Sequence, residues 1–378
     1  MKDENISMKT AALELSAVLL PTNLVRRFVA CAAVSAFGLT PAMAQTAGSE
    51  LPTGFAGITI AAGNGTAKTT TLVSIPMLED LPSTFTGSRT GRITGVGSNS
   101  ITVANAGWTA GLLSASAAPY LIEITSGAAQ GLMLLVSTAT ANTADTVTID
   151  AAEITRVGNL TALGISTEPG AGDTFRVWPV DTLGSFLGTP ESTGIQGGTS
   201  ATAADTVVLV INGSATTYFY NTATTPPRWS RAGINSDASN VAIPPYAGVQ
   251  YSRLGASPLE FRVLGRMPVG SRKVAIKNSG TTLLSPYWPV NQTLSSLGLH
   301  NLPGWQSGSS ATAADTVVLT SNGSATTYYH DGTNWRRAGI NSNANSVAVP
   351  PGVSLLISKR GTASGFAIYQ HSAPYSSE

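Results

Sequence analysis

The sequence predicts an all-β protein made of small sandwich or barrel domains with an internal duplication. Three observations predict this class. Charged residues make up only 11% of the 378 residues, although exposed helices need a charged or polar face. The chain contains 39 Gly and 21 Pro and many Thr and Val residues, which favour turns and strands. A long segment of the chain also recurs at a constant spacing, which is typical of two like domains.

The repeat is closest where Ser200–Leu209 returns unchanged as Ser310–Leu319, 110 positions later. The spacing falls to 106 past the turn after Tyr220, and loops between fixed strands tolerate such length changes. Four further pairs of segments match: Trp178–Val180 with Trp288–Val290, Asn212–Tyr218 with Asn322–Tyr328, Trp229–Asn235 with Trp335–Asn341, and Val241–Pro245 with Val347–Pro351.

Each copy contains a hairpin signal. Asn212-Gly213 lies between two runs rich in β-branched and aromatic residues, and Asn322-Gly323 repeats the pattern. Asn and Gly both tolerate the positive φ of a type I′ turn, so we expect a two-residue hairpin turn at each place.

The chain is expected to divide into six segments. The similarity of Thr71–Pro76 to Thr282–Pro286 suggests that the distinct β-domain is inserted into the first repeat, although a domain preceding that repeat stays an alternative. The segments are a signal peptide at 1–44, N-terminal strands at 45–83, a distinct β-domain at 84–176, β-repeat 1 at 177–255, β-repeat 2 at 256–361 and a C-terminal tail at 362–378.

The first segment has the order of a secretory signal. Arg26-Arg27 precede the apolar run Phe28–Leu39, and Ala42-Met43-Ala44 supplies a small-residue cleavage site. We therefore expect export, to the extracellular space or the cell surface, with the periplasm as an alternative. Cleavage after Ala44 would remove Cys31, the single cysteine, and with it any disulfide chemistry.

Charge and hydropathy exclude two kinds of partner. Four of the 21 basic and three of the 20 acidic residues precede residue 45, so the rest of the chain carries 17 of each. A neutral chain offers little attraction to phosphate backbones, and we expect no nucleic-acid partner. No stretch beyond the leader reaches about 18 apolar residues, so we expect no membrane span.

Aromatic residues are the candidate ligand-binding groups. An exposed row of them could stack on sugar rings, but their equivalent places in the two copies favour a core role, since one face of each hairpin must be buried. The candidates are Tyr218, Tyr220, Trp229, Tyr328 and Trp335.

No catalytic, cofactor-binding or metal-binding residue is expected. None of the three histidines, His300, His330 and His371, has a second ligand at metal-site spacing. An aspartate precedes a strand in three Ala-Asp-Thr motifs, where it either closes a turn on the backbone, which we favour, or binds calcium. These aspartates are Asp145, Asp205 and Asp315.

Several short motifs carry a resemblance: Thr84–Gly87, Gly91–Ile93, Trp108–Gly111, Ile124–Gly127, Asn142–Thr146 and Trp178–Leu183. They resemble an uncharacterised family of secreted bacterial all-β proteins that often has many paralogues in one genome. The resemblance implies export and an all-β fold. That family has no assigned activity, so the resemblance transfers no catalytic residue.

These observations predict a secreted, non-enzymatic structural or surface-interaction protein of the cell envelope or extracellular matrix. The alternative is an array of carbohydrate-binding β-modules. The expected partners are accordingly further copies of the chain or a surface polysaccharide.

Overall fold

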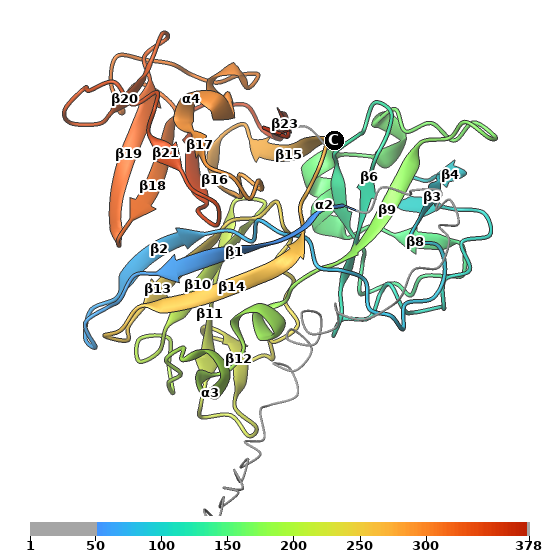
Figure 1. Ribbon diagram of the computed structural model, residues 1–378, viewed down its shortest axis with the longest axis horizontal. Coiled ribbons are helices and arrows are strands. Elements are labelled where there is room, and N and C mark those ends of the chain that lie inside the picture. Colours follow the sequence, from blue (N-terminus) through green and yellow to red (C-terminus); the bar gives the residue numbers. More distant parts are fainter. Residues whose placement is uncertain (1–50, 376–378) are drawn as a thin grey trace, which may run out of the picture. The chain divides into compact units, whose positions relative to one another are not determined.

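The computed structural model describes residues 51–375, which all belong to one compact unit. The predicted all-β class is confirmed, because the described chain is mostly strands with a few short helices (Figure 1). No sheet among the described residues closes into a barrel. Between residues 51 and 375, no helix is both long and apolar enough to cross a membrane. The predicted signal peptide lies outside the described residues.

The first large sheet has five strands in the order β12-β11-β10-β13-β2. Asn212 and Gly213 turn between β10 and β11 with φ of 51° and 79°, which confirms the predicted hairpin. The strands are β2 (Thr69–Val73), β10 (Thr206–Ile211), β11 (Ser214–Asn221), β12 (Arg228–Arg231) and β13 (Val249–Arg253).

The second large sheet has five strands in the order β16-β22-β18-β19-β20. Its hairpin turns at Asn322 and Gly323, with φ of 49° and 77°. Val317 pairs with Tyr328 as Val207 pairs with Tyr218, so the two hairpins share one register. The strands are β16 (Gly280–Leu284), β18 (Thr316–Ser321), β19 (Ser324–His330), β20 (Trp335–Arg337) and β22 (Leu355–Lys359).

A two-stranded ribbon packs against each large sheet. In the first ribbon, residues alternate between buried and exposed, as expected where one face covers a core. Ile58 and Phe261 pack with the core of the first sheet, and Ile276 and Tyr369 with that of the second. The ribbons are β1 (Thr53–Ile60) with β14 (Leu259–Arg266), and β15 (Ser271–Lys277) with β23 (Phe366–Ser372).

The chain between β2 and β10 forms most of a third core, in which Trp108, Ile122 and Phe175 are buried. It contains sheets of order β3-β9-β6-β7 and β4-β5-β8. The strands are β3 (Thr90–Arg92), β4 (Gly95–Val96), β5 (Ser100–Thr102), β6 (Tyr120–Ile124), β7 (Met133–Leu135), β8 (Thr146–Thr148) and β9 (Thr174–Pro179).

Short helices and one small sheet complete the described chain. The helices are α2 (Ala151–Val157), η2 (Leu160–Ala162), η3 (Leu183–Leu187), α3 (Pro190–Thr193), α4 (Leu294–Leu297) and η4 (Leu299–Asn301). The small sheet pairs β17 (Gln292–Thr293) with β21 (Ala348–Val349).

Two strand pairs connect segments that the sequence predicted to be separate. β2, from the N-terminal strands, pairs with β13 and so completes the first large sheet. β14 begins after residue 256 but pairs with β1 over its full length (Figure 1). A boundary between β14 and β15 therefore keeps every strand with its partner.

The two large sheets exchange equivalent backbone hydrogen bonds. Ser354 donates its N–H to the carbonyl of Leu72 at 3.3 Å, and Gly248 donates to Leu283 at 3.1 Å. The residues of the two bonds are equivalent in the repeat. Ser354 lies 106 positions after Gly248, and Leu283 lies 211 positions after Leu72, the same offset as between Thr71 and Thr282. Such mutual contacts through one patch on each side are the geometry of an isologous interface, here formed within one chain.

Candidate functional site

The structure places all five candidate aromatic residues in the core. Trp229 and Trp335 are 1% and 0% exposed, and the three tyrosines are at most 8% exposed. Each tryptophan lies across the strand pair from Tyr220 or His330, respectively. Buried rings cannot stack on a polysaccharide, so these side chains stabilise the sheets rather than form a platform.

The aspartates of two Ala-Asp-Thr motifs bind the backbone of their own copy. Asp205 accepts from the N–H groups of Gln196 at 2.8 Å and Leu254 at 2.7 Å. Asp315 accepts from the equivalent Gln306 at 2.8 Å and from Arg360 at 2.7 Å. These bonds close a loop before β10 and β18, which accounts for the carboxylates without a calcium ion.

Two of the three histidines lie together. His300 and His330 stack with ring centroids 4.4 Å apart, against the edge of Trp335. Burial lowers the pKa of both rings below the ordinary value of 6.5. The third, His371, accepts from the indole N–H of Trp288 at 2.7 Å through Nδ1. Within the described residues, no cluster of His, Cys, Asp and Glu has the makings of a metal site.

Two identical turns follow the edge strands of the large sheets. Both have the sequence Arg-Ala-Gly-Ile-Asn, at Arg231–Asn235 and Arg337–Asn341. In both, the glycine has a φ of 86° and the alanine N–H bonds to a threonine carbonyl of the preceding strand at 2.9 Å. Their isoleucines, Ile234 and Ile340, are 55% and 64% exposed. We call this pair the twin turns.

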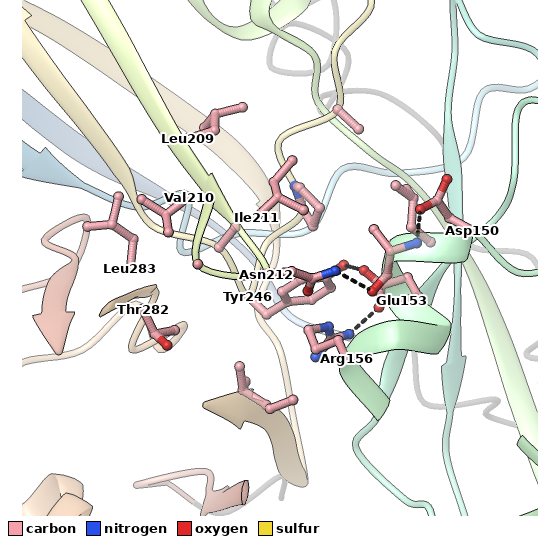
Figure 2. A pocket seen from close by; sticks show the side chains of 18 of the residues that line it. Asp150, Glu153, Arg156, Leu209, Val210, Ile211, Asn212, Tyr246, Thr282 and Leu283 are labelled. Atoms are coloured by element: carbon pink, nitrogen blue, oxygen red, sulfur yellow. Dashed lines mark hydrogen bonds and ion pairs between the residues drawn. The ribbon is translucent and has the colours of Figure 1, made fainter. Parts of the chain in front are cut away.

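A pocket of about 220 Å³ lies where helix α2, strand β10, the segment 241–247 and strands β15 and β16 meet (Figure 2). It is lined mostly by aliphatic side chains. On one side lie Val210 of β10 and Leu283 of β16, and on the other lie the polar side chains of α2. Ile211 also lines the pocket and is 45% exposed, which places the pocket's rim beside it.

The polar end of the pocket is a buried cluster of three side chains. Glu153 forms an ion pair with Arg156 one helical turn further along α2, and it also accepts from the hydroxyl of Tyr246. The Arg156 guanidinium lies 4.3 Å from the centroid of the Tyr246 ring and donates to the carbonyl of Met133 at 3.1 Å. Helix α2 begins at Asp150, whose carboxylate accepts from the N–H of Ala152 at 2.8 Å.

The cluster keeps its charges fixed. Burial and the neighbouring Glu153 carboxylate raise the pKa of Tyr246 well above its usual range, so its hydroxyl stays protonated and donates. Burial disfavours the charged form of Arg156, but the attraction to Glu153 outweighs that effect, so the pKa of Arg156 is raised. Arg156 therefore remains a cation inside the protein.

The polar end has donors that no protein group satisfies. Nε and Nη1 of Arg156 are buried and have no hydrogen-bond partner in the described part of the chain. Buried donors without partners are rare in folded proteins, because each costs the free energy of its lost hydration. These atoms can therefore receive an acceptor from a bound molecule.

A backbone donor lies on the opposite side of the pocket. The Leu283 carbonyl accepts from Gly248, so the backbone polar groups of Leu283 face away from β22 and toward β10. At the equivalent place in the other copy, the Leu72 N–H donates to the hydroxyl of Thr320 at 2.7 Å. Val210 occupies the position of Thr320, and valine has no acceptor.

The pocket residues were not among the residues predicted from the sequence to form a site. A local signal for α2 exists, since Asp150 is a good N-cap and Glu153 and Arg156 are spaced for an ion pair on one helix face. No spacing in the sequence indicates that Tyr246 and Leu283 join them, because these residues come from separate strands and loops.

The fold and these features define an all-β protein with a largely apolar pocket and two equivalent surface turns. No protein family model matches the chain, and neither a curated protein nor a solved structure matches it significantly.

Proposed function

We propose that this protein is an exported, non-enzymatic surface-interaction protein of the cell envelope or extracellular matrix. The twin turns are the observation that carries the proposal. Export is supported by the leader sequence, in which two arginines, an apolar run and a small-residue site follow one another.

A single exposed isoleucine is common on protein surfaces and requires no explanation. The twin turns differ because the same five residues, with the same bond from alanine to a threonine carbonyl, expose isoleucine in both copies. Arg231 and Arg337 are exposed beside them. Two equal contact points on one molecule bind a repetitive surface more tightly than either point alone.

The buried carboxylates support a structural role for the interior. Glu123 of β6 pairs with Arg272 of β15 and accepts from the indole of Trp178 at 2.6 Å. This ion pair joins the third core to the second ribbon. Like Asp205 and Asp315, Glu123 is used to hold strands together.

The alternative function, a carbohydrate-binding array, required an exposed row of aromatic residues. The five candidates are buried, so they form no such row. A polysaccharide stays a candidate partner for the twin turns, beside another copy of the chain.

The test replaces both exposed isoleucines, as Ile234→Ser with Ile340→Ser. Self-association is measured by sedimentation velocity, and surface binding by retention of the protein on isolated bacterial envelope material. We expect the double variant to lose the interaction that the wild-type protein shows, and each single variant to lose part of it.

The matched control is Leu264→Ser. Leu264 is 47% exposed, like the two isoleucines, but it lies on β14 and outside the twin turns. The control should behave as the wild type. If the double variant and the wild type interact equally well, or if neither interacts with envelope material or with itself, the proposal fails.

A further inference from the structure

We infer that the pocket between α2, β10 and β16 binds a small neutral amphiphile, an acyl amide or ester, whose carbonyl oxygen accepts a hydrogen bond from the Leu283 N–H. The apolar part of this molecule lies among the aliphatic residues of the pocket. Binding at this place is separate from the twin turns and does not depend on their role.

The polar groups of the pocket call for an acceptor. Nε and Nη1 of Arg156 lack a protein acceptor there. The N–H of Leu283, whose residue also lines the pocket, has no hydroxyl beside it like that of Thr320, because Val210 occupies the equivalent position. The carboxylate oxygens of Glu153 are already occupied by Arg156 and Tyr246. A ligand that brings an oxygen acceptor satisfies a buried donor, whereas a donor-only ligand does not.

The size and the lining of the pocket indicate an apolar body. Its volume of about 220 Å³ exceeds the roughly 150 Å³ of an apolar cavity that holds benzene. The larger apolar side chains that line it come from six separate segments: Leu135, Leu209, Val210, Ile211, Val241, Val274, Leu283 and Phe366. A short acyl chain matches this volume, and burial of its methylenes supplies most of the binding free energy.

The charges around the pocket favour a neutral ligand. Asp150, Glu153 and Arg156 line it, and the ammonium group of Lys277 lies close to Gly213, which also lines it. Two carboxylates and two cations leave no net charge. A ligand carboxylate would lose its hydration there and would meet the acidic side chains, so it should bind more weakly than an amide.

The comparison between the two copies isolates one determinant. Thr320 of the second sheet accepts from the Leu72 N–H of the first, whereas the equivalent Val210 offers no hydroxyl to the Leu283 N–H. Helix α2 then encloses this side with its polar cluster. The specificity-determining difference is therefore the missing hydroxyl at residue 210.

The experiment titrates the full mature chain with hexanamide, hexanoate and hexylamine by calorimetry, with thermal stabilisation as a second readout. We expect hexanamide to bind, and hexanoate and hexylamine to bind about tenfold more weakly or not at all. The substitution Val210→Thr supplies the hydroxyl that Thr320 has, so affinity for hexanamide should fall by about fivefold to tenfold.

The reciprocal substitution Thr320→Val is the matched control. It removes the acceptor of Leu72 on the other side of the interface, and hexanamide affinity should be unchanged. A second variant, Ala247→Leu, adds bulk at a residue that lines the pocket and should abolish binding without moving the twin turns.

Three results would overturn the inference: no binding of hexanamide to the wild type, equal affinity in Val210→Thr, or equal loss in Thr320→Val. Pocket-dependent retention on phosphatidylcholine vesicles without binding of free hexanamide would also overturn it, because the acyl chain would then belong to a bilayer. The turn variant Ile234→Ser with Ile340→Ser should bind hexanamide normally, which separates this outcome from that of the proposed function.

Discussion

Trp229 and Trp335 occupy the same position in the two large sheets, but only one of their indole N–H groups is satisfied. Trp229 donates to the carbonyl of Gly188 at 2.9 Å. Trp335 Nε1 is buried and has no partner among the described residues. Trp335 instead contacts the rings of His300, His330 and Trp305. The second sheet has thus replaced a hydrogen bond by aromatic packing.

This difference leads to a stability prediction. Trp229→Ala and Trp335→Ala should each lower the free energy of unfolding by about 3–5 kcal/mol, because each removes a fully buried ring. Trp229→Phe should cost about 1 kcal/mol more than Trp335→Phe, since it also leaves the Gly188 carbonyl without its donor. Urea unfolding of the four variants measures both effects. Phe55→Ala, at a residue 75% exposed, is the control and should stay within about 0.5 kcal/mol of wild type. Unchanged stability in either alanine variant would contradict the core role.

The ion pair in the pocket gives a second prediction. Arg156→Met should destabilise the protein by about 3–5 kcal/mol, because it leaves the Glu153 carboxylate buried with only the Tyr246 hydroxyl. Combining Glu153→Gln with Arg156→Met removes both charges and should recover much of that loss. Denaturant melts of the single and double variants check this. Additive losses in the double variant would show that the pair is not energetically coupled.

The stacked histidines predict a loss of stability in mild acid. Burial lowers the folded-state pKa of His300 and His330 below 6.5, so the unfolded chain binds protons more readily than the folded protein. These two rings therefore do not lower the free energy of unfolding at a pH above the histidine pKa of the unfolded chain. The free energy of unfolding falls as the pH drops below that pKa. Urea midpoints across this range should decrease toward acid pH.

Two substitutions test the origin of that slope. His330→Tyr installs the residue that the first copy has at Tyr220 and should flatten the pH dependence. Tyr220→His should steepen it by placing a buried imidazole in the first sheet, which has no histidine. An unchanged slope in His330→Tyr would assign the acid sensitivity to other groups.

The leader predicts processing after Ala44. The mature protein recovered from the producing cell should begin at Gln45, because the small-residue site follows the apolar run directly. N-terminal sequencing or intact mass measures this. Recovery of a form that retains Cys31 would be inconsistent with cleavage at this site.

Local chemistry made some parts of the fold predictable. The Asn-Gly hairpins follow from the positive φ that these two residues tolerate, and the all-β class follows from composition. The core position of Trp229 and Trp335 follows from their equivalent places in the two copies, since each sheet must bury one of its faces.

The pocket could not be predicted in the same way. It depends on where the edge of β16 meets β10, and this contact is set by packing between residues far apart in the chain. Val210 and Thr320 differ visibly in an otherwise matching segment, but the meaning of that difference requires knowing that Leu72 and Leu283 lie beside them. Helix α2 was missed because seven residues are too few to outweigh an all-β composition.

The mutual backbone bonds between the large sheets have an evolutionary consequence. In a homodimer, one codon encodes both sides of an isologous contact, so a substitution that opens a pocket on one side opens it on the other. Here Ser354–Leu72 and Gly248–Leu283 are encoded separately. One side can therefore keep Thr320, whose hydroxyl accepts from the Leu72 N–H, while the other side carries Val210. Joining both halves in one polypeptide frees this protein to be asymmetric at an interface whose backbone geometry stays symmetric.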